Sequence, residues 1–558
     1  MRPWPHSSPF SKSPKQGLDP RYIHNVVPSL RPDTEVLFSY TSTRWLCNDK
    51  DGTSTRYVPF DPDGLERVAC KSVRARQCVS WTKIGSFNRV FLLEFDNGTE
   101  AAIRIPFPVV GNVGRTIASE VATIMSYIRD RWLNGPLVFA WNSSYDNPVR
   151  TPYIILEYSP GVPLGARWLQ IQGTDVSPAL EGIVTLDRIL LQRPFSQHGS
   201  LYFADDLPED LRTRPLYPGD EHTEELDLHL DSKYKIGPTV NREWWRGHYG
   251  RVDANRGPWP DMQTMITSAA EFQLRALDLG VVDLASAHVK SAHPDVPLLR
   301  RMLELCIHAA PLIVPSDPAL TAPVLNHPNL SLPNLVVSEE GPARILHSID
   351  WQGATVSPFC MQADTPPAVA YTGGVIPVPE DGSMPPWPSN FDSMTTEEQE
   401  YIRIHHRLAC RHRAYSLGAL LTDSRYEAWS LPHFASLVKL VPFITRCVAE
   451  GPADLQGVLI DLEQKWTSIT SDGSIPCPID FTPEEIAAHA ERMECQAEYE
   501  RNVAQLYREL GCLADGSVET QEYEAAKMRM KRFREEWDET AMKGPFPLCE
   551  GAPSYYLS

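Results

Sequence analysis

Residues 327–334 read HPNLSLPN, and this short polar stretch decides how the rest of the chain is interpreted. The apolar run LVV follows at 335–337, and after the turn SEEGPAR comes a second run, ILHSID, at 345–350. Two short apolar runs separated by a turn rich in polar residues and glycine are typical of an antiparallel hairpin. The sequence therefore predicts a polar loop followed by two strands, the second of which ends at Asp350.

The spacing within this stretch matches a catalytic loop of the form His-x-Asp-x-x-x-x-Asn, except at its third position. In such a loop the third residue accepts a hydroxyl proton and the last binds Mg²⁺, while an acid after the following hairpin binds Mg²⁺ as well. Asn334 and Asp350 are the predicted metal ligands, and His327 and Asn329 are the predicted catalytic-loop residues. Because a neutral amide cannot act as a general base at ordinary pH, Asn329 could orient a hydroxyl group but could not deprotonate it.

Upstream, residues 84–90 read IGSFNRV and join two predicted strands. A turn of small residues allows backbone N–H groups to approach phosphate oxygens, so Gly85, Ser86 and Phe87 are candidate phosphate-binding positions. A simple hairpin turn would look the same. The strand that begins at Val90 is followed by Asp-Asn-Gly, a strong hairpin signal, and then by a strand over 100–105.

A cation on this last strand has a possible partner on the helix that follows. Apolar residues recur at helical spacing from 116 to 131, and Glu120 lies in this helix, 16 residues after Arg104. A strand cation held by a helix carboxylate is the arrangement that grips the α- and β-phosphates of a nucleotide in kinase-like folds. The alternative is a surface arginine and an unrelated helix acid.

Composition excludes several classes of protein. The chain has 558 residues and a formal net charge of −19, which argues against a general nucleic-acid or anionic-membrane surface. No stretch approaches the ~18 uninterrupted apolar residues of a membrane-spanning helix. The first 18 residues lack acids, which is typical of a mitochondrial presequence, but four prolines there would break an amphipathic helix.

The pattern of elements predicts five regions. Residues 1–35 read as a flexible lead, 36–160 as an N-lobe with nucleotide-binding hairpins, and 161–365 as a C-lobe that carries the catalytic-type loop. Residues 366–395 form a proline-rich loop, and 396–558 a helical C-terminal part. Within this last part a capping box at Thr482 starts a helix that Gly511 ends, and a second helix follows, which predicts a helical hairpin that covers the body or mediates dimerisation.

Taken together, the motifs resemble the fungal phosphotransferase-enzyme family, which is similar to aminoglycoside phosphotransferases and choline kinases and includes the altered-inheritance-of-mitochondria proteins. The similarity covers about 36–450 and is carried by RWLCN (44–48), KIGSFNRVFLLEFDNGTEAAIRIPFP (83–108), SEVATI (119–124), YIILEYSPGVPLGARW (153–168), NHPNLSLPNLVVS (326–338) and SIDWQGATVSPF (348–359).

The resemblance implies an α+β, protein-kinase-like two-lobed fold with a C-terminal helical extension, and ATP and Mg²⁺ as cofactors. It implies that backbone atoms near Glu157 and Tyr158 contact the adenine. It also implies mitochondrial residence, while the residues themselves leave mitochondrial and cytoplasmic locations both open. The function expected is phosphoryl transfer to an unknown small-molecule acceptor, weakened by Asn329. The alternative is a pseudokinase that binds nucleotide and acts through a protein partner or a homodimer formed by its C-terminal helices.

Overall fold

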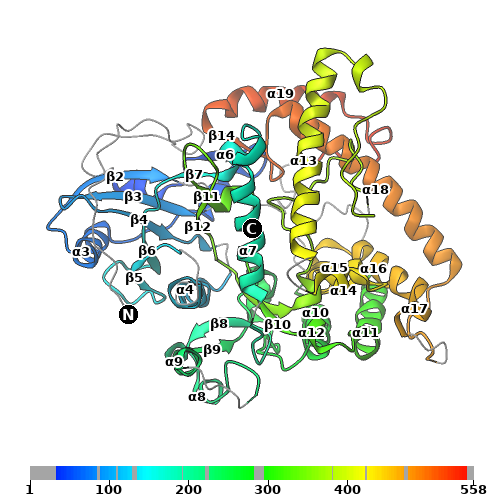
Figure 1. Ribbon diagram of the computed structural model, residues 1–558, viewed down its shortest axis with the longest axis horizontal. Coiled ribbons are helices and arrows are strands. Elements are labelled where there is room, and N and C mark those ends of the chain that lie inside the picture. The colour runs from blue at the N-terminus through cyan, green and yellow to red at the C-terminus, as the bar shows by residue number, and fades with distance from the viewer. Residues whose placement is uncertain are drawn as a thin grey trace.

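The computed structural model describes residues 33–84, 88–108, 111–128, 135–191, 193–219, 225–281, 295–379, 381–420, 424–470 and 475–548. Within these ranges the chain forms two lobes and a helical extension (Figure 1). Gly85, Ser86 and Phe87 fall outside the described residues, as do residues 1–32 of the predicted flexible lead.

The N-lobe is built on a five-stranded antiparallel sheet in the order β2-β3-β4-β6-β5. The strands are β2 (Cys78–Ile84), β3 (Arg89–Phe95), β4 (Glu100–Ile105), β5 (Val138–Asn142) and β6 (Tyr153–Glu157). The predicted Asp-Asn-Gly turn joins β3 to β4, where Gly98 has φ +81° and its N–H donates to the carbonyl of Phe95. Alternating apolar residues are buried on both faces of this sheet, so both faces are covered by other elements.

Helix α4 (Val113–Ala122) packs on one face of the sheet, with Ile117 and Val121 against Ile154 of β6. The predicted helix therefore begins three residues earlier than its apolar pattern suggested, because Asn112 caps it by accepting from Arg115 N–H at 3.1 Å. Beyond Ala122 the backbone continues as a π-helical turn, Thr123–Ile128.

The N-terminal segment covers the other face of the sheet. It contains α1 (Thr34–Phe38), β1 (Thr43–Trp45), α2 (Asp49–Ser54) and α3 (Pro62–Ser72). Leu37, Phe60 and Leu65 of this segment share a buried cluster with Phe91 of β3 and Ile103 of β4. Residues 37–73 are thus part of the N-lobe core.

The C-lobe is mostly helical and carries two short hairpins. β11 (Leu335–Val337) pairs with β12 (Ile345–Ser348) and with β7 (Val162–Pro163), while β10 (Pro323–Asn326) pairs with β13 (Thr355–Pro358). The predicted strand pair around the polar loop is confirmed. The helices of this lobe include α6 (Leu164–Trp168), α7 (Ser177–Leu191), α10 (Met262–Asp278), α11 (Val296–Ile313), α12 (Pro318–Thr321), α13 (Thr396–Leu420), α14 (Arg425–Trp429), α15 (Phe434–Glu450), α16 (Ala453–Gln464) and α17 (Trp466–Thr470).

The aromatic and acidic insertion at 196–260 folds into β8 (Ser200–Phe203), β9 (Tyr234–Gly237), α8 (Glu209–Arg212) and α9 (Glu225–Lys233). Trp244 and Trp259 are buried with Phe272 of α10 in the largest core cluster. Trp244 and Trp259 are therefore core residues.

The C-terminal extension consists of α18 (Pro483–Leu510), β14 (Ser517–Glu519) and α19 (Tyr523–Glu536). Both hydrogen bonds of the predicted capping box between Thr482 and Glu485 are present, and Gly511 ends the helix with φ +71°. β14 does not pair with its sequence neighbours but with β1, more than 470 residues earlier in the chain. The architecture is an α+β, protein-kinase-like two-lobed fold with a C-terminal helical extension.

Candidate functional site

Arg104 and Glu120 meet in the interior of the N-lobe. Arg104 lies near the end of β4, opposite Val90 of β3 and Ile154 of β6, and its guanidinium forms an ion pair with the Glu120 carboxylate. The side chain of Glu120 is 1% exposed and that of Arg104 8% exposed. The pair predicted from the sequence is therefore formed and buried.

Arg104 also reaches across to the C-lobe, where its Nη1 lies 3.2 Å from Oδ1 of Asp350. Burial lowers the pKa of Arg104, and the Asp350 carboxylate opposes this shift. An arginine remains protonated even so, because its intrinsic pKa is far above neutral pH. The buried charge is thus held between two carboxylates, one from each lobe.

His327 is a neutral side chain that is held by hydrogen bonds inside the catalytic-type loop. Its side chain is 4% exposed, and Nε2 lies 3.1 Å from the carbonyl of Ile349, to which its proton is donated. Nδ1 accepts from the backbone N–H of Asn329 at 3.1 Å. Burial lowers the pKa of His327 to about 4. Since both ring nitrogens are engaged with backbone, the geometry favours a positioning role for His327 rather than proton transfer.

The two predicted metal ligands are tied to each other through the backbone. The side-chain N–H of Asn334 donates to the carbonyl of Asn329 at 2.9 Å. The Asn334 Oδ1 atom is then the side-chain acceptor that remains for a ligand. The N–H of Ile349, the residue before Asp350, donates to the carbonyl of Asn334 at 3.0 Å. The loop and the end of the hairpin therefore form one rigid unit.

Asp350 adopts the left-handed backbone conformation, with φ +63°, which is uncommon for a residue other than glycine. The next residue anchors it: Trp351 is fully buried, donates Nε1–H to the carbonyl of Ser348 at 3.1 Å, and packs on the His327 ring. The Asp350 side chain itself is 43% exposed. A strained conformation that leaves a carboxylate accessible is typical of a functional position.

The donor set suits a cation that arrives with its own oxygen ligands. Within the described ranges no group of three or more His, Cys, Asp or Glu side chains gathers as a ready metal site. Asn334 and Asp350 supply one amide oxygen and one carboxylate. Mg²⁺ is commonly bound by one or two carboxylates, with phosphate and water oxygens filling the remaining positions.

Several polar atoms near this junction are buried without a hydrogen-bond partner in the described structure. They belong to residues that flank the two lobes' facing edges: Arg104 Nε, Asn88 Oδ1, Ser348 Oγ and Gln352 Oε1. Buried polar groups are normally paired, and exceptions often mark a place that a ligand or water completes.

The predicted adenine-contacting segment, Glu157 and Tyr158, lies where the chain passes from β6 to the C-lobe. The Glu157 N–H donates to the Leu137 carbonyl at 2.7 Å, and the Tyr158 N–H lies 3.4 Å from the Glu100 carbonyl. Gly161 follows with φ +128°, and a Cβ there would stand 2.6 Å from the Val337 carbonyl oxygen. The segment that crosses between the lobes thus packs closely against β11. That the backbone near Glu157 and Tyr158 contacts the adenine stays a prediction.

A cavity of about 240 Å³ opens beside the catalytic-type loop. Its lining includes the loop residues His327, Asn329 and their neighbours, together with two carboxylates, Asp187 and Asp364. Arg425 holds Asp187 through an ion pair of 2.6 Å, whereas the Asp364 carboxylate bonds to the adjacent Thr365 N–H. The lining contains no lysine or arginine.

The sequence did not single out Asp187 or Asp364. The proline-rich segment, predicted as a loop or linker, forms a wall of this cavity with Pro366 and Pro367. The Ala368 N–H fixes it by donating to the Leu330 carbonyl at 2.9 Å. No local motif marks these residues, because they are separated from the loop by more than 30 positions.

Comparison with known proteins yields two sets of similar chains. A protein named subtelomeric hrmA-associated cluster protein, from Aspergillus fumigatus, is 28% identical over 510 residues, covering 83% of this chain and 94% of that protein. A protein named altered inheritance of mitochondria protein 9, mitochondrial, from Yarrowia lipolytica, is 26% identical over 482 residues and covers 78% of each chain. No family model matches the chain.

Among solved structures, a protein assigned as a fructosamine-3-kinase from Thermobifida fusca is 14% identical, with a TM-score of 0.34, and covers 71% of this chain and 98% of that one. The GDP complex of an aminoglycoside 2'-phosphotransferase is 12% identical, with a TM-score of 0.28, and covers 73% and 100%. Because these TM-scores lie below 0.5, the description of the fold rests on the strand order and contacts given above.

Proposed function

We propose that the chain belongs to one kinase-like family with the relatives named altered inheritance of mitochondria proteins, and that it binds Mg·ATP and transfers a phosphoryl group to a hydroxyl of a small molecule. The observation that carries this proposal is the junction of the two lobes. There Arg104, paired with Glu120, meets Asp350, whose hairpin is tied to Asn334.

The residues at this junction supply what phosphoryl transfer requires. Such a reaction depends mostly on positioning and on stabilising the charge of the phosphate oxygens, and little on covalent chemistry by the protein. The Arg104 guanidinium can hold phosphate oxygens with its planar fork, and Glu120 fixes its orientation. Asn334 and Asp350 would hold the Mg²⁺, which when bound neutralises charge on the phosphates.

The cavity beside Asn329 is the proposed place of the acceptor. The Asn329 side chain can donate or accept a hydrogen bond and so orient a hydroxyl group, although it cannot remove the proton. Asp364 adds a negative charge to a lining that has no lysine or arginine, whereas the charge of Asp187, which also lines the cavity, is compensated by Arg425. We therefore expect a neutral or cationic acceptor and not one that carries a phosphate or carboxylate.

A second candidate function follows from Asn329 itself. This second function is that of a pseudokinase: without a carboxylate at the third loop position, the chain binds nucleotide and does not turn it over. The two functions differ in one measurable property, since both require Mg·ATP binding and only the first requires consumption of the γ-phosphate.

The test pairs thermal unfolding with and without Mg·ATP and an ATP-turnover assay of wild type and Asn329→Asp. We expect Mg·ATP to stabilise the wild type, and the variant to raise turnover about tenfold, because a correctly placed general base contributes to hydroxyl activation. Asn326→Asp is the matched control, since it adds the same charge to the same cavity outside the loop motif.

Each outcome separates the alternatives. If Mg·ATP neither stabilises the protein nor is consumed by either variant, the proposal of nucleotide chemistry is wrong. Turnover by the wild type that equals that of Asn329→Asp would exclude the pseudokinase. Turnover that appears only in Asn329→Asp, and not in Asn326→Asp, would favour it.

We further propose that the protein resides in mitochondria, as the names of several relatives state for those proteins. In the described part of the chain no helix is both long and apolar enough to cross a membrane. Fluorescent fusions of the full chain and of a chain that begins at residue 33 test this proposal, which predicts mitochondrial signal for the full chain.

A further inference from the structure

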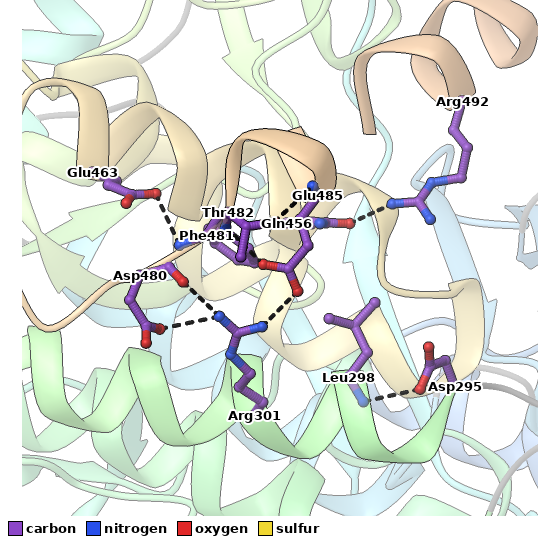
Figure 2. A network of polar contacts seen from close by, with 10 residues as sticks. All are labelled: Asp295, Leu298, Arg301, Gln456, Glu463, Asp480, Phe481, Thr482, Glu485 and Arg492. Carbon is purple, nitrogen blue, oxygen red and sulfur yellow. Dashed lines mark hydrogen bonds and ion pairs between the residues drawn. The ribbon is translucent and has the colours of Figure 1, made fainter. Parts of the chain in front are cut away.

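The C-terminal extension contacts both the C-lobe and the N-terminal segment of the N-lobe. Figure 2 shows its first end, which is bound to the C-lobe. Arg301 of α11 donates to the Glu485 carboxylate at 2.7 Å, to the Asp480 carbonyl at 2.7 Å and to the Asp480 carboxylate at 3.1 Å. About two turns further along α18, Arg492 donates to Gln456 of α16 at 2.7 Å. The start of α18 is thus attached to two C-lobe helices.

The other end of the extension is attached to the N-terminal segment. With 28 residues, α18 spans about 42 Å at 1.5 Å per residue, which carries the chain away from α11 and α16. β14 then pairs with β1, the Trp45 Nε1–H donates to Asp515 at 3.2 Å, and the Arg44 guanidinium lies 3.7 Å from the centre of the Tyr523 ring. Leu46 is buried in a cluster with Leu506, Leu510, Val518, Tyr523, Ala526, Phe546 and Leu548 of the extension.

The N-terminal segment in turn holds the two strands that flank residues 85–87. Lys83 of β2 donates to the Ser39 carbonyl at 2.9 Å and to the Thr41 hydroxyl at 3.0 Å. Arg89 of β3, which is 1% exposed, donates to the backbone carbonyls of Arg56 and Val58 at 2.9 and 3.0 Å. Each of these cations is bound by residues of the segment that carries β1.

We propose that α18, β14 and β1 form a strap that joins the lobes independently of the chain crossing at 158–161 and holds the β2–β3 hairpin in place. The contacts form a continuous path from Arg301 to Lys83 and Arg89. The proposal deepens the proposed function, because the β2–β3 hairpin carries the predicted phosphate-binding turn, but the strap itself exists whether or not nucleotide binds.

Hydrogen exchange of the nucleotide-free full chain tests the strap directly. Arg301→Ala removes the polar contacts of α11 with the strap's C-lobe end, and the matched control is Arg300→Ala, the adjacent residue, whose carboxylate partner at 2.6 Å is Asp278 of α10. We expect Arg301→Ala to raise the exchange rate of amides in 39–46 and 83–84 and 88–91 about threefold or more, since local opening there loses its distant anchor. Arg300→Ala should leave these amides unchanged.

A substitution at the other end of the strap tests whether the effect is more than local. Val518→Asp places a charge in the buried cluster around Leu46, whereas Leu513→Asp places the same charge at an exposed position of the extension. We expect faster exchange in β2 and β3 with Val518→Asp and not with Leu513→Asp. If Val518→Asp prevents folding, Arg301→Ala alone decides the matter.

Faster exchange confined to 475–520 in Arg301→Ala would overturn the strap. If the strap holds and the proposed function is also correct, Arg301→Ala weakens Mg·ATP binding about threefold or more, because ordering the loosened hairpin opposes binding. If Arg301→Ala shows faster exchange at β2 and β3 while the wild type binds no nucleotide, the strap is supported and the proposed function is contradicted. The strap and the proposed function can therefore fail separately.

Discussion

Removing the charge of Glu120 should destabilise the N-lobe and abolish nucleotide binding. Glu120→Gln keeps the shape of the side chain but leaves Arg104 buried with one carboxylate, Asp350, in place of two. Breaking one side of a buried ion pair typically costs about 3–5 kcal/mol. The remaining contact with the 43%-exposed Asp350 offsets about 1 kcal/mol, as a half-exposed pair does. We therefore expect a loss of about 2–4 kcal/mol.

The assay is urea unfolding followed by tryptophan fluorescence, combined with hydrogen exchange of β4 and α4 to locate the effect. Glu100→Gln is the matched control, since Glu100 is exposed at the start of the same strand, and it should change the free energy of unfolding by less than about 0.5 kcal/mol. The double variant Glu120→Gln with Arg104→Met removes both charges. It should recover most of the lost stability, because replacing a buried pair by uncharged groups is often close to neutral.

The double variant separates stability from function. It should fold and still fail to be stabilised by Mg·ATP, because the phosphate cation is gone. If Glu120→Gln unfolds at the same urea concentration as the wild type, Glu120 does not compensate a buried charge. If the double variant is as unstable as the single one, the loss arises from packing and the electrostatic argument is wrong.

Two further predictions concern stability. Burial lowers the pKa of His327 to about 4. Below about pH 6.5 the unfolded state therefore binds a proton that the folded state does not bind. The stability that neutral His327 contributes is present above pH 6.5 and is lost as pH falls toward 4. His327→Gln should reduce the decline in thermal unfolding temperature between pH 7 and 5, and an unchanged decline would exclude His327 as its source. Gly161→Ala should cost about 2–4 kcal/mol, since it combines a positive φ with a contact of 2.6 Å to the Val337 carbonyl. Gly173→Ala, at φ +57° with open space around it, should cost about 1 kcal/mol, and equal losses at the two glycines in denaturant unfolding would show that the contact is unimportant.

The sequence alone predicted most of the local structure on which the site depends. The hairpins around Asp-Asn-Gly and around the polar loop are confirmed, as is the capping box that starts α18. Each depends on interactions between residues that are close in sequence, so turn chemistry and apolar periodicity suffice to locate them. The predicted kinase-like fold class is confirmed as well, while the roles of the site residues stay predictions.

Only the tertiary structure could show that Asp187 and Asp364 share a cavity with Asn329, that Asp350 contacts Arg104, and that β14 pairs with β1. These contacts join residues from 35 to more than 470 positions apart in the chain. A sequence pattern records the neighbours of a residue along the chain. Which distant side chain meets it depends on how whole elements pack, and that is decided by the complete set of buried surfaces.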